Sequence, residues 1–164
     1  MNHIDIDKLL SFHVDDRPSW DIYFLRFAIL ASSRSTCHRR QHGAVITKDN
    51  QILATGYNAS PSKLMHCKGI CLREAHNIPS GTRYELCRSI HAEENAILQC
   101  AKHGISCQDS VMYITGYPCI MCARSIINCG IRKIILLHAD LKDNFAEKTL
   151  RSSEVEVFVH GSCV

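Results

Sequence analysis

Two short segments carry residues that could bind a metal ion and move protons. His91, Ala92 and Glu93 begin one predicted helix, while Cys119 and Cys122 begin the next. Cysteines at positions i and i+3 lie on the same face of a helix. The helix dipole and the unpaired amides at a helix N-terminus also favour the thiolate form. Both sulfurs can therefore bind one ion.

His91 would complete a set of three protein ligands. A tetrahedral zinc ion with three protein ligands keeps a fourth position for water, which is the arrangement of catalytic sites. Zinc lowers the pKa of bound water from about 15.7 to about 7. Glu93 follows His91 by two residues, and we expect it to carry the protons. The alternative is a closed zinc ribbon, in which Cys119 and Cys122 pair with two further cysteines.

The other cysteines need their own interpretation, because the chain contains ten. In a reducing compartment disulfides are rare, so metal binding or catalysis is the better explanation for such a number. Four cysteines of the long connection and the loop before the predicted hairpin could form a second, structural zinc site, although four reduced buried thiols would also explain them: Cys37, Cys67, Cys71 and Cys87. The remainder are interpreted as packing residues: Cys100, Cys107, Cys129 and Cys163.

Alternating helices and strands would position these residues. Apolar residues at helical spacing predict helices over 19–33, 91–103, 119–129 and 144–151, two of them ended by Gly104 and Gly130. Short apolar runs predict strands over 44–47, 51–57, 111–115, 133–137 and 155–159, the first two forming a hairpin. The last two strands should be parallel, because a helix connects them. These elements predict an α/β fold, a three-layer α/β/α sandwich with a mixed five-stranded sheet.

Residues 58–87 form a connection without sustained periodicity. It contains Pro61, Gly69, Pro79 and Gly81. Connections of this length inside compact domains are usually functional, so we expect substrate or effector contacts here. The length of 164 residues suits one domain, with residues 1–16 as a loosely ordered extension.

Composition argues against nucleic-acid and membrane partners. The net charge is +3 from 19 basic and 16 acidic residues, and the one basic cluster, at Arg34, Arg39 and Arg40, is too small for a nucleic-acid surface. The first residues lack the features of a signal peptide, and no stretch is long and apolar enough to span a membrane. We therefore expect a cytoplasmic protein.

The motifs resemble those of a known enzyme family. His-x-Glu followed by Pro-Cys-x-x-Cys is a signature of zinc nucleobase deaminases. Residues 34–46, 54–61, 78–98 and 118–131 resemble the cytidine and deoxycytidylate deaminase family. The resemblance implies the cytidine deaminase-like fold and hydrolysis of dCMP to dUMP and ammonia, a supply reaction for thymidylate synthesis. It also implies a homo-oligomer, a hexamer or a dimer, with dCTP and dTTP as possible effectors.

The resemblance also implies roles for individual residues. Glu93 would deliver a proton to N3 of cytosine and then to the leaving ammonia, while Asn58 and Ala92 would contact the substrate. Four basic residues are candidates for phosphate or effector binding: Arg39, Arg40, Lys63 and Arg88. The chain departs from the family at Lys63 and at His42, which replaces a residue that is commonly apolar.

Three other functions remain open at this stage. A tRNA adenosine deaminase shares the His-Ala-Glu and Pro-Cys-x-x-Cys segments but should present a basic stripe for RNA phosphates. A deaminase of free cytidine or deoxycytidine would lack only the phosphate contacts. A non-catalytic nucleotide-binding relative would keep the zinc without turnover, although the intact Glu93 argues against it.

Overall fold

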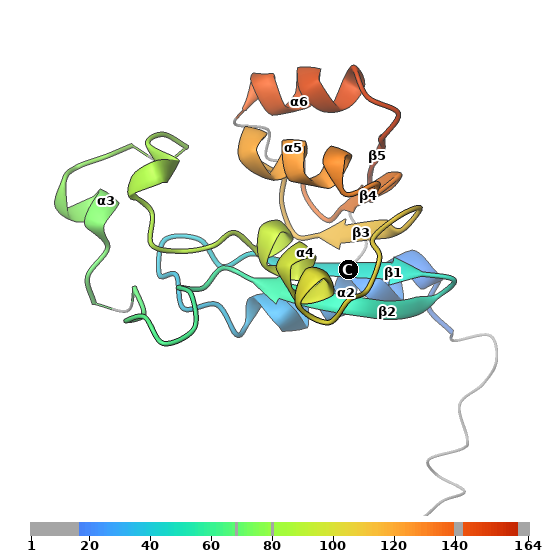
Figure 1. The fold of residues 1–164 in the computed structure, drawn as a ribbon, viewed down its shortest axis with the longest axis horizontal. Helices are drawn as coiled ribbons and strands as arrows, with labels where there is room; N and C mark the ends of the chain where they lie inside the picture. Colours follow the sequence, from blue (N-terminus) through green and yellow to red (C-terminus); the bar gives the residue numbers. More distant parts are fainter. Residues whose placement is uncertain (1–16, 68, 80, 140–142, 161–164) are drawn as a thin grey trace, which may run out of the picture.

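The computed structural model describes residues 17–67, 69–79, 81–139 and 143–160. The predicted extension 1–16 and Cys163 lie outside the described residues. A five-stranded sheet with the strand order β2-β1-β3-β4-β5 forms its centre (Figure 1). The strands are β1 (Gly43–Lys48), β2 (Gln51–Tyr57), β3 (Val111–Ile114), β4 (Lys133–Leu136) and β5 (Glu156–Val159).

The sheet is mixed, as predicted. Strand β1 runs antiparallel to both β2 and β3, whereas β3, β4 and β5 run parallel to one another. The prediction that the last two strands pair in parallel is confirmed. Their connection is the helix α6 (Asn144–Arg151), which is what a parallel pair requires.

Helices cover both faces of the sheet. Alternate residues of a strand point to opposite faces, and Val45 packs with the helix α2 (Trp20–Ser32), whereas Ala44 and Ile46 belong to the opposite core. That larger core contains residues of α4 (Ala92–Lys102), α5 (Ile120–Asn128) and α6. The predicted three-layer α/β/α sandwich is therefore confirmed (Figure 1).

The predicted helix boundaries are accurate to about one residue. His91 and Cys119 are the N-cap residues of α4 and α5, and glycines with positive φ follow their C-caps, Gly104 at 68° and Gly130 at 80°. Left-handed glycines are a common way to end a helix. None of the helices in the described ranges is long and apolar enough to cross a membrane.

Two glycines let the helices approach the sheet closely. A Cβ atom on Gly56 of β2 would lie 2.1 Å from the carbonyl oxygen of Ala92 in α4. A Cβ atom on Gly43 of β1 would lie 2.0 Å from the carbonyl oxygen of Ala28 in α2. Only glycine tolerates backbone contacts as short as these. The absence of a side chain at Gly56 therefore fixes the depth at which α4 packs against the sheet.

The connection between β2 and α4 projects from the rest of the molecule (Figure 1). It contains one turn of α-helix, α3 (Leu72–Ala75), and a 3-10 turn over Tyr84–Leu86, neither of which the sequence predicted. Its two ends are joined by backbone hydrogen bonds between Ala59 and Ile90, 2.9 and 3.2 Å long. The connection thus leaves and re-enters the fold at one place, next to the start of α4.

Candidate active site

The structure brings His91, Cys119 and Cys122 together. The Nδ1 atom of His91 lies 3.4 Å from the Cys119 sulfur and 3.5 Å from the Cys122 sulfur. Across the described residues, this is the one group of three or more His, Cys, Asp and Glu side chains whose ligand atoms all lie within 4.8 Å of one another. Residues separated by 28 positions in the sequence therefore form one cluster.

The spacing of these atoms fits tetrahedral zinc. Zinc binds sulfur at about 2.3 Å and nitrogen at about 2.0–2.1 Å, so tetrahedral ligands S and N should lie about 3.6 Å apart. The observed separations of 3.4 and 3.5 Å are close to this value. Three protein ligands leave one position open, which is the arrangement of a catalytic site and not of a closed ribbon.

The protonation of the cluster also favours a cation. Hydrogen bonding from Cys122 and interactions with His91 lower the pKa of the Cys119 thiol to about 4, even though burial opposes this. The pKa of Cys122 is raised, first by sharing that hydrogen bond and then by burial. Burial lowers the pKa of His91, but Cys119 and Glu93 outweigh it, and the net pKa is raised. The lowered pKa of Cys119 favours its thiolate form, which is the form that binds a metal ion.

Glu93 lies beside this cluster, in the first turn of α4. Its side chain is only 7% exposed, yet it lines the cavity that also contains His91 and Cys119. Burial raises the pKa of the Glu93 carboxyl, while His91 opposes the shift. A raised pKa makes this carboxylate a stronger base than that of an ordinary glutamate, next to the residues that would hold the metal.

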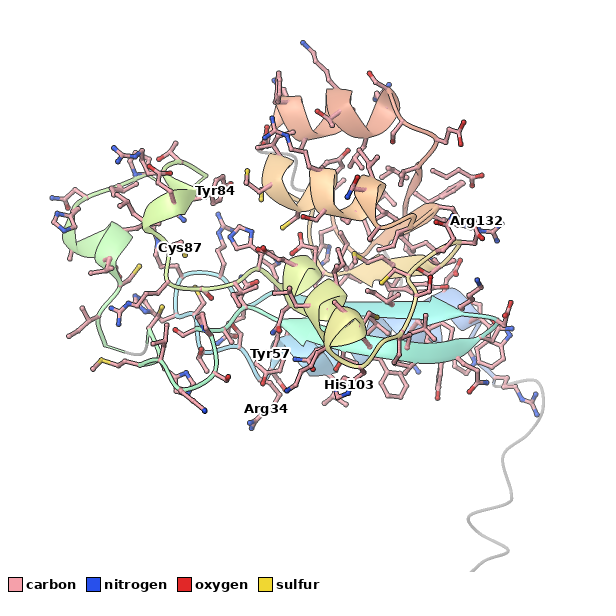
Figure 2. All side chains as sticks on the ribbon, viewed as in Figure 1. Arg34, Tyr57, Tyr84, Cys87, His103 and Arg132 are labelled. Atoms are coloured by element: carbon pink, nitrogen blue, oxygen red, sulfur yellow. The ribbon has the colours of Figure 1, made fainter. Side chains whose placement is uncertain are left out.

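Tyr84 covers the ligand histidine from the connection. Its ring meets the His91 ring edge to face at a centroid distance of 5.3 Å. The Tyr84 ring also contacts Arg73 of α3, whose guanidinium lies 5.3 Å from the centre of the ring. Figure 2 shows Tyr84 on the side of the connection that faces α5. The connection therefore forms the second wall of the site.

Three of the four basic residues predicted to bind phosphate or effector line the cavity, and one does not. Arg39, Arg40 and Arg88 line the same cavity as His91, while Lys63 is exposed and does not line it. Arg73, which the sequence reasoning missed, lines the cavity and is 8% exposed. The sequence did not predict that Arg73 lines the site, because the segment around it has no periodicity.

The two predicted substrate contacts are held by the protein itself. Asn58 is 4% exposed and lines the cavity, but its Oδ1 accepts a 2.8 Å hydrogen bond from the Ala92 backbone and its Nδ2 donates to the Arg40 carbonyl at 2.9 Å. Ala92 is fully buried in the first turn of α4. Contact of either residue with substrate remains a prediction.

The predicted second zinc site is not assembled in the same way as the first. Its four cysteines do line one cavity, namely Cys37, Cys67, Cys71 and Cys87. Their sulfurs do not form such a group, because among the described residues only the His91 cluster brings its ligand atoms within 4.8 Å of one another. The second zinc therefore stays a prediction. Of the cysteines interpreted as packing residues, Cys100 and Cys107 lie in the main core and Cys129 packs against it.

A family comparison decides what kind of site this is. Residues 18–138 match the family model described as the cytidine and deoxycytidylate deaminase zinc-binding region. The chain belongs to the cytidine and deoxycytidylate deaminase family. All three clustered ligands and Glu93 fall inside the matched residues, so the cluster lies in the zinc-binding region of this family.

Individual members of this deaminase family are similar over most of the chain. The deoxycytidylate deaminase of Saccharomyces cerevisiae is 35% identical over 86% of this chain, which spans 45% of the yeast protein. The chain thus spans about half the length of that relative. ComE operon protein 2 of Bacillus subtilis is 36% identical, with 87% of this chain and 71% of the relative covered. The family membership does not depend on one relative.

Solved structures agree with the fold. The dCMP deaminase of cyanophage S-TIM5, in complex with dCMP and dUMP, is 28% identical with a TM-score of 0.74, and the match covers 88% of this chain and 98% of that one. A tRNA:A34 deaminase is similar in fold alone, with a TM-score of 0.55 and 20% identity. The shared fold therefore does not by itself choose the substrate.

Proposed function

We propose that this deaminase hydrolyses dCMP to dUMP and ammonia. When bound at His91, Cys119 and Cys122, zinc supplies Lewis-acid activation of water at neutral pH. The helix N-termini hold these three side chains, and the packing of Tyr84 on His91 excludes solvent from that ligand.

Glu93 handles the protons in this proposal. It accepts the proton that the attacking water releases and passes it to N3 of cytosine. After the water oxygen has bonded to C4, Glu93 takes the second proton from that oxygen and delivers it to the amino group on C4, so that the C4–N bond breaks, ammonia leaves and the C4 carbonyl of dUMP forms. A buried carboxyl with a raised pKa suits this role, because its carboxylate is a stronger base than that of an ordinary glutamate.

The observation that carries the choice of a nucleotide is the charge of the cavity wall. Two carboxylates line the cavity, Glu93 and Asp143. Four arginines also line it, namely Arg39, Arg40, Arg73 and Arg88. No described residue accepts a hydrogen bond from the buried Nε atoms of Arg73 and Arg88. A buried donor without an acceptor is costly, and a phosphate oxygen would satisfy it. A nucleoside offers no such group.

The arginines are also held in place by the connection. Arg73 donates to the carbonyl oxygen of Pro79 at 2.9 Å, and Arg88 donates to that of Ile70 at 3.0 Å. Each guanidinium thus donates one of these hydrogen bonds to a backbone carbonyl, and both arginines line the cavity. A fork held in this way matches the geometry of a phosphate group better than a mobile surface lysine would.

A substrate comparison tests the proposal. The zinc-loaded protein is incubated with dCMP, CMP, deoxycytidine and dCTP, and ammonia release is followed. We expect the highest kcat/KM for dCMP. Removing a hydrogen bond to a charged group costs about 1.5–3 kcal/mol, so Arg73→Gln should lower kcat/KM for dCMP about 10- to 100-fold while leaving deoxycytidine unaffected.

Lys63→Gln is the matched control. It also removes one positive charge from the connection, but Lys63 is exposed and lies outside the cavity lining. We expect its kinetics to equal those of the parent protein. If deoxycytidine or CMP is the better substrate, or if Arg73→Gln affects dCMP and deoxycytidine equally, the nucleotide specificity proposed here is wrong.

The wider setting belongs to the same proposal. We place the reaction in the cytoplasm as a supply of dUMP for thymidylate synthesis, in a homo-oligomer that dCTP and dTTP could regulate. The reducing environment accords with the many cysteines of the chain. Gel filtration and activity measurements with each nucleotide triphosphate test these points.

A further inference from the structure

The two helices that carry the zinc ligands begin without caps of their own. His91 and Cys119 occupy the N-cap positions of α4 and α5, where a side-chain oxygen usually binds a free amide of the first turn. Neither side chain makes such a bond. Both point instead toward each other at the metal site, 3.4 Å apart. Acting as a ligand thus prevents each residue from capping its helix.

Side chains from elsewhere in the sequence bind the first amide of each helix. The Oδ1 atom of Asn58 accepts from the Ala92 amide at 2.8 Å, and the Oδ2 atom of Asp143 accepts from the Ile120 amide at 3.0 Å. These amides are the first of the four that a helix leaves without intrahelical partners. Each one directly follows a zinc ligand in the sequence.

Both acceptors are themselves anchored. The Nδ2 atom of Asn58 donates to the Arg40 carbonyl at 2.9 Å, which ties α4 to the loop before β1. The Oδ1 atom of Asp143 accepts from the Phe145 and Ala146 amides at 3.0 and 3.1 Å, which makes Asp143 the N-cap of α6. Each acceptor therefore links a ligand-bearing helix to a second element.

We propose that Asn58 and Asp143 are positioning residues of the zinc centre. By holding the first turns of α4 and α5, they fix the separation between His91 and Cys119 at a value that suits zinc. A metal site tolerates deviations of only about 0.2 Å, and the loss of a residue that orients a ligand typically costs about 10- to 100-fold in metal affinity. The inference goes beyond the choice of substrate, because it concerns metal binding alone.

Asp143→Asn tests the α5 contact. A carboxylate has two acceptor oxygens, whereas an amide has one, so the asparagine cannot accept from Ile120 and cap α6 at the same time. We expect the dissociation constant for zinc, measured by competition with a chelator, to rise about 10- to 100-fold. We also expect the absorption spectrum of the cobalt-substituted protein, which reports the thiolate ligands, to change.

Ile120→Pro removes the donor in place of the acceptor. Proline is tolerated at the first position of a helix, and the extended conformation of Cys119, with φ of −74° and ψ of 169°, suits a residue before proline. Its zinc affinity should fall as in Asp143→Asn. The double variant should bind zinc as well as the weaker single variant does, because both changes remove the same hydrogen bond.

Asn58→Ala tests the α4 contact, with Asn95→Ala as its matched control. Asn95 lies in the same helix and donates to the Tyr57 carbonyl at 2.9 Å, but it does not bind the amide that follows His91. Ser19→Ala is the control for Asp143, since it removes the cap of α2, which carries no ligand. Both controls should lower Tm yet leave the zinc affinity and the cobalt spectrum unchanged.

The results separate this inference from a general loss of stability. It is overturned if Asn58→Ala and Asp143→Asn lower Tm but bind zinc as tightly as the parent protein, with an unchanged cobalt spectrum. It is also overturned if the control variants weaken zinc binding equally. Failure of the dCMP assay would leave these metal measurements unaffected, so the two proposals fail independently.

Discussion

The two walls of the cavity are built in different ways. On one wall, the N-termini of α4 and α5 carry His91, Glu93, Cys119 and Cys122, and regular backbone geometry determines where these side chains point. On the other wall, the connection has little regular structure, and hydrogen bonds to backbone carbonyls position its Arg73 and Arg88. The first wall carries the His91, Cys119 and Cys122 cluster and the buried carboxyl of Glu93. The second offers positive charge.

Because the two walls are built differently, substitutions should be able to change the chemistry of the site and its substrate specificity separately. A helix N-terminus leaves little freedom to its first residues. Substitutions in the wall formed by the N-termini of α4 and α5, the ligand wall, should therefore have large effects. A connection held by individual hydrogen bonds can change one side chain at a time. We therefore expect changes in the ligand wall to affect kcat and zinc binding, and changes in the connection to affect KM.

The largest effect should come from Glu93→Gln. A positioned side chain that transfers protons contributes about 10²–10⁴-fold, so kcat should fall by that factor while the zinc content stays at the parent value. Activity assays and metal analysis of the same sample check this. Glu94→Gln is the control, since Glu94 is the exposed neighbour on the same helix turn. Unchanged kcat in Glu93→Gln would remove Glu93 from its role.

A second test compares the cysteines of the two walls. If the predicted second zinc exists, metal analysis should give two zinc ions per chain, and Cys71→Ser should reduce this to one. Cys122→Ser should also remove one ion, but with complete loss of activity, because it removes a ligand of the catalytic cluster. One zinc ion per chain in the parent protein would contradict the second site.

Gly56→Ala should have an intermediate effect. The added Cβ would lie 2.1 Å from the Ala92 carbonyl oxygen, so α4 must move away from the sheet. Overpacking of this kind costs about 1–3 kcal/mol in the free energy of unfolding. Gly43→Ala creates a matching clash under α2 and should cost a similar amount. Urea unfolding measures both, and only Gly56→Ala should also weaken zinc binding.

The smallest effect concerns the pH dependence of stability. Burial, followed by the interaction with Cys107, raises the pKa of Cys100 from its ordinary value of 9.0 to about 12. Below pH 9 the thiol is protonated in both states, whereas above it the unfolded chain releases the proton and the folded chain keeps it. The free energy of unfolding should therefore fall between pH 9 and pH 12.

Cys100→Ala isolates this contribution. Alanine keeps the position apolar and cannot titrate, so the decline above pH 9 should be shallower in the variant than in the parent protein. Urea unfolding at pH 7, 9 and 10 measures the difference. Equal slopes for the two proteins would show that Cys100 titrates alike in the folded and unfolded chains.

Much of the ligand wall could be predicted from the sequence. Helical periodicity placed Cys119 and Cys122 at the start of a helix, and the structure begins α5 one residue after Cys119. The helical pattern of apolar residues over 91–103 similarly placed His91 and Glu93 at the start of α4. Local geometry suffices here, because residues within one helical turn keep the same relation in every protein.

The connection could not be predicted in the same way. Arg73 and Tyr84 are 11 residues apart, yet they contact each other and form one wall with Arg88. Asn58 was predicted to touch the substrate, but the structure shows both ends of its amide bound to the protein. Such pairings depend on how an irregular segment folds back, and no local pattern encodes that.

By itself, the sequence determined the order of helices and strands, the identity of the clustered ligands and the presence of a carboxyl group beside them. Each of these depends on the period of a helix or strand, or on the chemistry of one side chain. Tertiary structure alone decided that four arginines meet at the site, that Gly56 seats α4, and that Asn58 and Asp143 bind the amides next to the ligands. The reason is physical, because hydrogen bonds and close packing form between whatever groups the complete fold brings together, at any separation along the chain.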